Sequence, residues 1–235
     1  MDKKPIIVIT GASKGIGRGM AEYYLTKGFL VAGCSRGEST LNSEDYMHSQ
    51  IDVGNEREVR KWIRSIKKVY KRIDALVCMA AYAPANLLLT MTSAAHLEPV
   101  LKTNIAGTYY VCGEVAKIMM QQRSGRIITV SSMAVGLHEV GTSAYACSKS
   151  AIVEMTKILA KELAPVGVTC NIIAPSIYQS EGVDALGDEV IERAREKLTF
   201  KNNLEIEELC HVVDFYIAPE SKQISGQVTH LGLVC

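Results

Sequence analysis

The chain has 235 residues, of which 48% are hydrophobic and 22% are charged, and its formal net charge is +1. This length fits one globular domain with a large core, and the near-neutral charge argues against a nucleic-acid-binding protein that works through a basic field. The sequence contains no apolar run of the about 18 residues that a membrane span needs. It also shows no secretory signal after Met1, so we expect a cytoplasmic protein.

Seven cysteines and five histidines are scattered through the sequence. The cysteines never form a Cys-x-x-Cys pair, so we expect reduced, mostly buried thiols and neither a disulfide framework nor a zinc site. The histidines are equally dispersed, and no metal site is predicted.

Short apolar runs predict strands that alternate with helical segments. Uninterrupted apolar character is typical of strands covered on both faces, and repeated β-α-β order implies right-handed crossovers. We therefore expect one domain over residues 1–235 with an α/β fold, a three-layer doubly wound parallel sheet (Rossmann fold). The predicted strands are Ile6–Thr10, Leu30–Cys34, Met47–Ile51, Ala75–Met79, Arg126–Ser131, Val168–Ile173 and Gln227–Leu231. The predicted helices are Ile16–Thr26, Glu56–Tyr70, Glu98–Gln121, Tyr145–Ala164, Asp188–Leu198 and Glu205–Ala218.

The connection between the second and third predicted strands is short. Only fifteen residues separate Arg36 from Asp52, and they are rich in turn formers. A helix and a strand hardly fit there, so we expect this crossover to be a loop.

A glycine-rich segment at residues 10–17 links the first predicted strand to the first helix. Its spacing departs from the G-x-G-x-x-G dinucleotide pattern, but the strand–turn–helix context is the same. Gly11 can form the tight turn, Gly15 lets the backbone approach a pyrophosphate, and Gly17 lets helix and sheet pack closely. A glycine-rich turn without a ligand is the alternative interpretation. The residues predicted to bind a cofactor here are Gly11, Ala12, Ser13, Lys14, Gly15, Ile16 and Gly17.

The end of the second predicted strand discriminates between the two nicotinamide cofactors. An NAD site uses an Asp or Glu about 20 residues after the turn to bind the ribose 2′-hydroxyl. This strand instead ends in Ser35 and Arg36, and a guanidinium pairs bidentately with a 2′-phosphate. Lys14 would add a second positive charge. Either residue alone is typical of a solvated surface, but together they favour NADP(H).

Tyr145 and Lys149 lie four residues apart, which places both side chains on one face of a helix. A neighbouring ammonium lowers the pKa of a phenol and makes it a usable proton donor and acceptor. Such a pair alone is weak evidence, but it follows a predicted strand that ends in Ser131 and Ser132. Open α/β sheets bind ligands at the carboxyl ends of their strands.

The ordered set of motifs resembles the short-chain dehydrogenase/reductase family over nearly the whole chain. The matching segments are Thr10–Gly17, Asp52-Val53, Asn104–Gly107, Ser131-Ser132, Tyr145 with Lys149, and Asn171 with Pro175. The resemblance implies that Ser132 holds the substrate oxygen and that Tyr145 gives or takes a proton there. It also implies that Tyr145 and Lys149 belong to the cofactor site, where Lys149 binds the nicotinamide ribose and lowers the pKa of the tyrosine. Asn104 would anchor a water for proton relay.

Further cofactor contacts follow from the same resemblance. Asp52 and Val53 would cover the adenine, and the segment at 175–180 would border the nicotinamide through Pro175, Ser176, Tyr178 and Ser180. The family's usual Asn-Asn-Ala-Gly is replaced by Cys-Met-Ala-Ala at 78–81, of which Ala80 is assigned to the cofactor site. This replacement removes side-chain hydrogen bonds that tie the central sheet together.

Within the family, the chain is most similar to the 3-oxoacyl-[acyl-carrier-protein] reductases of fatty acid or polyketide biosynthesis. Those enzymes dock an acidic carrier protein through two basic positions near the mouth of the active site. Arg123 matches one position, but Val166 occupies the other, so the docking signal is half present. The resemblance also implies a homodimer or homotetramer that uses the two long helices predicted at 98–121 and 145–164.

The sequence thus predicts an NADPH-dependent enzyme that reduces a carbonyl of a small-molecule or acyl-thioester substrate. Two alternatives remain open. One is an alcohol or ring-diol dehydrogenase of secondary metabolism, against which Arg36 argues. The other is a non-catalytic NADP-binding sensor, which the altered segment at 78–81 supports and the Asn104, Ser132, Tyr145 and Lys149 set opposes.

Overall fold

The computed structural model describes residues 4–178 and 188–234. Seven strands form one sheet in the order β3-β2-β1-β4-β5-β6-β7, and every neighbouring pair is parallel. The predicted doubly wound fold is confirmed, and each strand lies within one residue of its predicted bounds. The strands are β1 Ile6–Thr10, β2 Leu30–Ser35, β3 Tyr46–Gln50, β4 Ala75–Cys78, β5 Gly125–Val130, β6 Val168–Ala174 and β7 Val228–His230.

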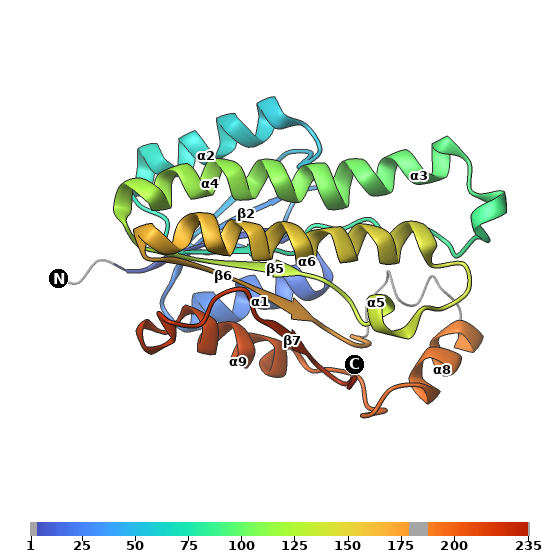
Figure 1. The fold of residues 1–235 in the computed structure, drawn as a ribbon. Helices are drawn as coiled ribbons and strands as arrows, with labels where there is room; N and C mark the ends of the chain where they lie inside the picture. Colours follow the sequence, from blue (N-terminus) through green and yellow to red (C-terminus); the bar gives the residue numbers. More distant parts are fainter. Residues whose placement is uncertain (1–3, 179–187, 235) are drawn as a thin grey trace.

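Helices cover both faces of the sheet and make it the middle of three layers (Figure 1). One face packs against α2 (Glu56–Tyr70), α4 (Thr108–Gln122) and α6 (Ser143–Leu163), with Trp62, Met119 and Leu163 in that core. The other face packs against α1 (Gly15–Thr26) and α9 (Ile206–Ile217). Both faces of the central strands are therefore dry, as their apolar runs require. Shorter helices are α3 (Ala94–Val100), α5 (Ala134–Leu137) and α8 (Asp188–Glu196), with 3₁₀ turns at Leu89–Met91, Ala164–Val166 and Pro219–Ser221.

The crossover from β2 to β3 is a loop over residues 36–45, as predicted. The α1 and α9 layer consequently has no helix from this connection beside β3. Leu41 and Tyr46 pack against the core on that face instead.

The predicted helix at 98–121 differs from the structure. Helix α3 begins at Ala94, a π-helical segment follows at Leu101–Gly107, and α4 continues to Gln122. A π segment adds a residue to the helical turn and shifts every later side chain around the helix axis. The apolar periodicity on either side of the segment does not reveal this shift.

Gly17 allows α1 to pack closely against the glycine-rich turn in which it lies. A Cβ atom at this position would lie 2.3 Å from the carbonyl oxygen of Gly11, which is a backbone atom and cannot move aside cheaply. At Gly113 in α4, by contrast, a Cβ atom would meet nothing within 4 Å.

We therefore expect Gly17→Ala to lower the free energy of unfolding by about 1–3 kcal/mol, because the added methyl group overpacks this contact. The matched helical control, Gly113→Ala, should raise it by up to about 1 kcal/mol through helix propensity. Urea unfolding monitored by circular dichroism measures both changes. Equal effects of the two substitutions would contradict this account of Gly17.

Candidate active site

The predicted catalytic residues meet at the carboxyl edge of the sheet, where β5 ends beside the start of α6. Tyr145 and Lys149 occupy the first two turns of α6, and the Lys149 Nζ atom lies 5.7 Å from the centre of the Tyr145 ring. Ser132 follows β5, and its hydroxyl lies close enough to the Tyr145 phenol to influence the pKa of that phenol. Ser131 is buried instead and donates to the carbonyl oxygen of Lys149 at 3.3 Å. The structure thus brings Ser132, rather than Ser131, to the tyrosine.

Burial governs the ionisation of both α6 side chains. It raises the pKa of the Tyr145 phenol above its ordinary value, and the nearby Ser132 hydroxyl offsets this increase only in part. Lys149 is 4% exposed, and burial lowers its pKa from 10.5 to about 8. Its Nζ atom donates to the carbonyl oxygen of Val130 at 2.9 Å. Burial is therefore the main influence on both groups, because it raises the pKa of the phenol and lowers that of the amine.

Asn104 lies within the π-helical segment and joins it to α6. Its Oδ1 atom accepts from the Tyr82 backbone N–H at 2.7 Å, and its Nδ2 atom donates to the Tyr82 carbonyl oxygen at 3.0 Å. Nδ2 also donates to the Ser148 hydroxyl at 2.9 Å, and Ser148 in turn donates to the Tyr145 carbonyl oxygen. Asn104 is 1% exposed. It thus fixes the chain after β4 against the turn of α6 that carries Tyr145 and Lys149.

The glycine turn closes over the ends of β1 and β4. Gly11 and Gly15 have φ angles of +72° and +55°, which favour glycine, and a Cβ atom on Gly11 would lie 3.0 Å from the backbone of Ala80. The Ala80 N–H donates to the Thr10 hydroxyl at 2.9 Å. Ala80 and the turn are therefore adjacent, as their assignment to one site requires. Around them, Ala12 is buried, Ser13 and Ile16 are half-buried, and Lys14 is exposed.

The segment at 78–81 shows what replaces the family's asparagines. Cys78 is buried on the α4 side of the sheet, and its Sγ atom lies 3.6 Å from that of Cys112. Side-chain hydrogen bonding there is reduced to this thiol pair. The link from Thr10 to the Ala80 backbone remains.

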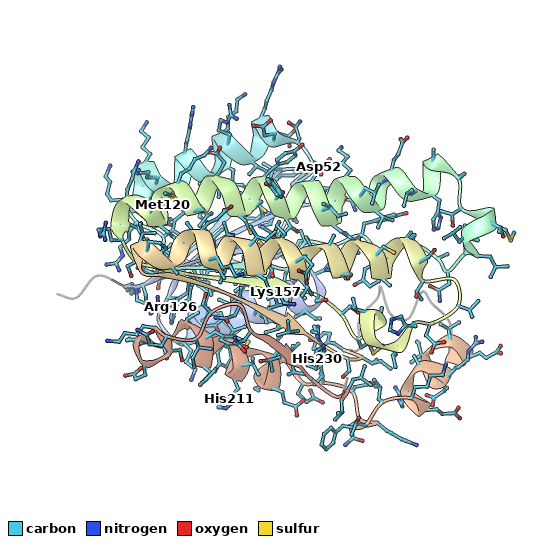
Figure 2. All side chains as sticks on the ribbon, viewed as in Figure 1. Asp52, Met120, Arg126, Lys157, His211 and His230 are labelled. Atoms are coloured by element: carbon cyan, nitrogen blue, oxygen red, sulfur yellow. The ribbon has the colours of Figure 1, made fainter. Side chains whose placement is uncertain are left out.

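Arg36 and Asp52 follow β2 and β3, which are neighbouring strands of the sheet. Arg36 is exposed, and Asp52, labelled in Figure 2, accepts from Lys102 at 2.8 Å and from the Gly54 N–H at 2.9 Å. Although burial opposes it, the hydrogen bond from Lys102 keeps the pKa of Asp52 below its ordinary value, with a smaller contribution from Arg36. Val53 is buried against the π-helical segment, where a Cβ atom on Gly107 would lie 2.8 Å from it.

Residues after β6 form the remaining wall of this edge. Pro175 accepts from the Met133 N–H at 3.1 Å, and Tyr178 is half-buried. Ser176 is buried, and its hydroxyl has no hydrogen-bond partner among the described residues. Ser180 lies outside the described residues.

Three residues that stabilise this edge of the sheet were not predicted from the sequence. Lys102 neutralises Asp52, Thr10 holds Ala80, and Ser148 links Asn104 to α6. Their partners are 50, 70 and 44 residues away in the chain. Only the position of Thr10, at the end of a strand that enters the glycine turn, is a signal that the sequence itself contains.

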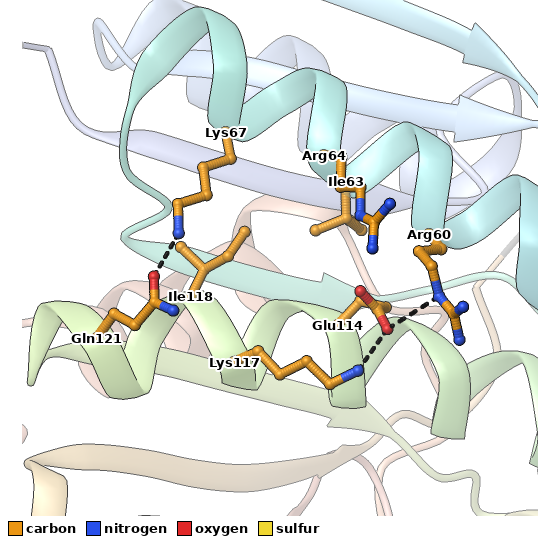
Figure 3. A pocket seen from close by; sticks show the side chains of 8 residues that line it. All are labelled: Arg60, Ile63, Arg64, Lys67, Glu114, Lys117, Ile118 and Gln121. Atoms are coloured by element: carbon orange, nitrogen blue, oxygen red, sulfur yellow. Dashed lines mark hydrogen bonds and ion pairs between the residues drawn. The ribbon is translucent and has the colours of Figure 1, made fainter.

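A separate groove runs between α2 and α4, on the outer side of the sheet (Figure 3). Glu114 is one of its lining residues and pairs with Lys117 at 2.6 Å and with Arg60 at 3.6 Å. Long side chains of α2 project away from the sheet around it (Figure 2). The groove contains none of the residues described above, so it is not part of the site at the carboxyl edge.

Two further findings concern the described part of the chain. It contains no group of three or more His, Cys, Asp or Glu side chains that could hold a metal ion. None of its helices is both long enough and apolar enough to cross a membrane.

The three hydrogen bonds of the Asn104 side chain should contribute to the stability of the protein. Asn104→Ala leaves two backbone groups of Tyr82 and the Ser148 hydroxyl without their partner, so we expect a loss of about 2–4 kcal/mol in the free energy of unfolding. Chemical unfolding measures this loss. Gln122→Ala is a control, because its amide also joins two segments but far from this edge, at Ile73. A stable Asn104→Ala protein would contradict the bracing role.

Lys149 generates a prediction about pH. Its folded-state pKa of about 8 lies below its ordinary 10.5, so the unfolded chain binds more protons between these values and stability rises with pH across that window. The stability of the wild type relative to Lys149→Met should therefore rise by about 3 kcal/mol from pH 8 to pH 10.5 and stay level below pH 8. Denaturant titrations of both proteins measure this difference. A difference that stays constant or falls would contradict burial of the amine.

Comparisons with known proteins agree with this arrangement. The short chain dehydrogenase family matches residues 5–190. The 3-oxoacyl-[acyl-carrier-protein] reductase FabG of Staphylococcus epidermidis is 29% identical over 234 residues, covering 95% of this chain and 96% of that protein. The reductase of the same name from Buchnera aphidicola subsp. Baizongia pistaciae is 30% identical, covering 97% and 96%.

Solved structures show the same fold. ElxO with NADP bound has a TM-score of 0.89 and 26% identity and covers 97% of both chains. A short-chain type dehydrogenase/reductase from Mycobacterium ulcerans has a TM-score of 0.90 at 21% identity, covering 97% of this chain and 88% of that one. The resemblance drawn from the motifs is confirmed, and the chain belongs to the short-chain dehydrogenase family.

Proposed function

We propose that this protein is an NADP(H)-dependent reductase that converts the ketone of a 3-oxoacyl thioester, or of a similar substrate, to the alcohol. The observation that carries the proposal is the hydroxyl pair of Ser132 and Tyr145 beside buried Lys149, next to the glycine turn. The names of the relatives support the substrate class, and the NADP bound to ElxO supports the cofactor.

The described residues fit a dinucleotide. Gly11 and Gly15 leave an open backbone at the start of α1, where free N–H groups favour a pyrophosphate. Arg36 is exposed for a 2′-phosphate, while Lys102 offsets the nearby negative charge of Asp52. When bound, the cofactor supplies hydride to the carbonyl carbon.

The protein's own residues then handle the oxygen. Ser132 donates a hydrogen bond to the substrate carbonyl, so that the negative charge of the developing alkoxide meets a donor already in place. Tyr145 supplies the proton to that oxygen, and its raised pKa keeps the phenol protonated before the reaction. Lys149, with a pKa of about 8, is mostly an ammonium at neutral pH. It stabilises the phenolate that Tyr145 becomes and can return a proton to it.

The two positions considered for carrier-protein docking lie away from this site within one chain. Arg123 ends α4 just before β5, and Val166 lies just before β6, so both are at the amino edge of the sheet. The end of β5 and the start of α6, which carry Ser132 and Tyr145, lie at the opposite edge (Figure 1). Within one chain, Arg123 is therefore not at the mouth of this site.

We also propose that the protein works as a homodimer or homotetramer in the cytoplasm. The outer surfaces of α4 and α6 expose the large apolar side chains Tyr109, Met120 and Ile158. Association through these helices would remove that apolar surface from water.

Replacing the proton donor tests the reaction. Tyr145→Phe should lower kcat/KM for acetoacetyl-coenzyme A reduction by about 10²–10⁴-fold, because the phenylalanine has no proton to give. Binding of NADPH, followed by fluorescence, should change little. Tyr70→Phe in α2 is the matched control and should keep full activity.

The same assay separates the alternatives. A Tyr145→Phe enzyme that reduces the ketone of the substrate at the wild-type rate would refute the role of the tyrosine. A wild-type protein that binds NADPH but turns over no ketone would support a sensor. Preferred oxidation of alcohols with NAD would support a dehydrogenase instead.

A further inference from the structure

The backbone that carries Arg36 is held by side chains of the edge strand β3. Tyr46, His48 and Gln50 alternate along β3, so they share one face of the strand. All three take part in hydrogen bonds that reach the segment Ser35–Gly37 or each other. Nothing in the family motifs assigns a role to these residues.

The hydrogen bonds form a chain with consistent donors. The Gly37 carbonyl oxygen can only accept, so His48 Nε2 carries a proton, and in the neutral ring Nδ1 accepts from the Tyr46 hydroxyl at 2.8 Å. His48 Nε2 then donates to the Gly37 carbonyl oxygen at 3.1 Å and to the Ser35 hydroxyl oxygen at 3.0 Å. Ser35 donates its own proton to the Gly37 carbonyl at 2.7 Å. His48 thus joins the residues on both sides of Arg36.

Gln50 holds the residue between them. Its Nε2 atom donates to the carbonyl oxygen of Arg36 at 2.8 Å. Ser35 at the end of β2 and the loop residues Arg36 and Gly37 are therefore each tied to side chains of β3. The Arg36 side chain itself remains exposed.

This clamp occupies the place beside β3 that the short crossover leaves without a helix. The Tyr46 ring lies over β2, and a Cβ atom on Gly33 would be 2.6 Å from the Tyr46 hydroxyl oxygen. Gly33 therefore provides the space that seats Tyr46, and Tyr46 orients His48. The side chains of β3 therefore hold the loop backbone in place where no helix packs against it.

We propose that His48 is a positioning residue for Arg36 and that the Tyr46–His48–Gln50 clamp sets the preference for NADPH over NADH. This inference rests on the proposed use of Arg36 to bind the 2′-phosphate. A guanidinium on a fixed backbone binds a phosphate with less loss of conformational freedom than one on a mobile loop. The clamp acts on the 2′-phosphate end alone, so it affects one cofactor and not the other.

The effect of the clamp on 2′-phosphate binding can be measured with two nucleotides, without following the reaction. Adenosine 2′,5′-bisphosphate and adenosine 5′-monophosphate differ only in the 2′-phosphate, and calorimetry gives the ratio of their affinities for each protein. His48→Leu removes the donor to Gly37, and we expect the ratio to fall by roughly ten-fold, with binding of the monophosphate nearly unchanged. His48→Gln places an amide donor in the same region and should recover most of the ratio.

Ser49→Ala is the matched control, because Ser49 lies on β3 between His48 and Gln50 and faces the other side of the sheet. It should keep the wild-type ratio. Gln50→Ala alters an exposed side chain, so it tests the clamp even where His48→Leu does not fold. We expect it to lower the ratio in the same direction.

The outcomes separate this inference from the function on which it rests. A wild-type protein that binds both nucleotides equally well would overturn the NADP(H) assignment and the clamp together. A wild-type preference for the bisphosphate that survives in both His48→Leu and Gln50→Ala would overturn the clamp alone. Equal loss of both nucleotides in folded His48→Leu would also overturn it, because the effect would not be confined to the 2′-phosphate.

Discussion

Burial of the Lys149 amine at the end of β5 is the constraint on which the site depends. An amine in an apolar interior needs a fixed acceptor, and the Val130 carbonyl supplies it. This contact docks the start of α6 against the strand that leads to Ser132. The Asn104–Ser148 bond fastens the same turn of α6 to the π-helical segment. Tyr145, which lies in the same turn of α6, is thereby held near the end of β5 and near the π-helical segment.

The parallel sheet explains why these groups meet. All of its strands end at one edge, so the segments that follow β1, β2, β4, β5 and β6 converge there. Burial of Lys149 lowers the free energy of unfolding, because it holds the pKa of this amine at about 8, below its ordinary value. The same burial keeps the tyrosine protonated, which suits a proton donor.

Much of the fold followed from local sequence. The continuous apolar run of Ile6–Thr10 predicts a buried strand, and the spacing of apolar residues in α2 predicts an amphipathic helix. The glycine turn and the Tyr145–Lys149 spacing likewise act over a few residues. Long-range partners did not follow: the contact of Asn104 with Ser148 and the clamp of His48 depend on how distant elements pack beside one another. The amino-edge position of Arg123, by contrast, is implied by its place just before the predicted strand at 126–131. The π-helical segment also escaped prediction, because one extra residue in a turn leaves the apolar composition unchanged.

The most direct test of the catalytic account is the pH dependence of kcat/KM for ketone reduction with NADPH. This parameter reports ionisations of the free enzyme, where Lys149 has a pKa of about 8. Because reduction uses a protonated Tyr145 and a charged Lys149, the account predicts a level profile below about pH 8 and a decline above it. A profile that stays level to about pH 10, or that rises with pH, would contradict it.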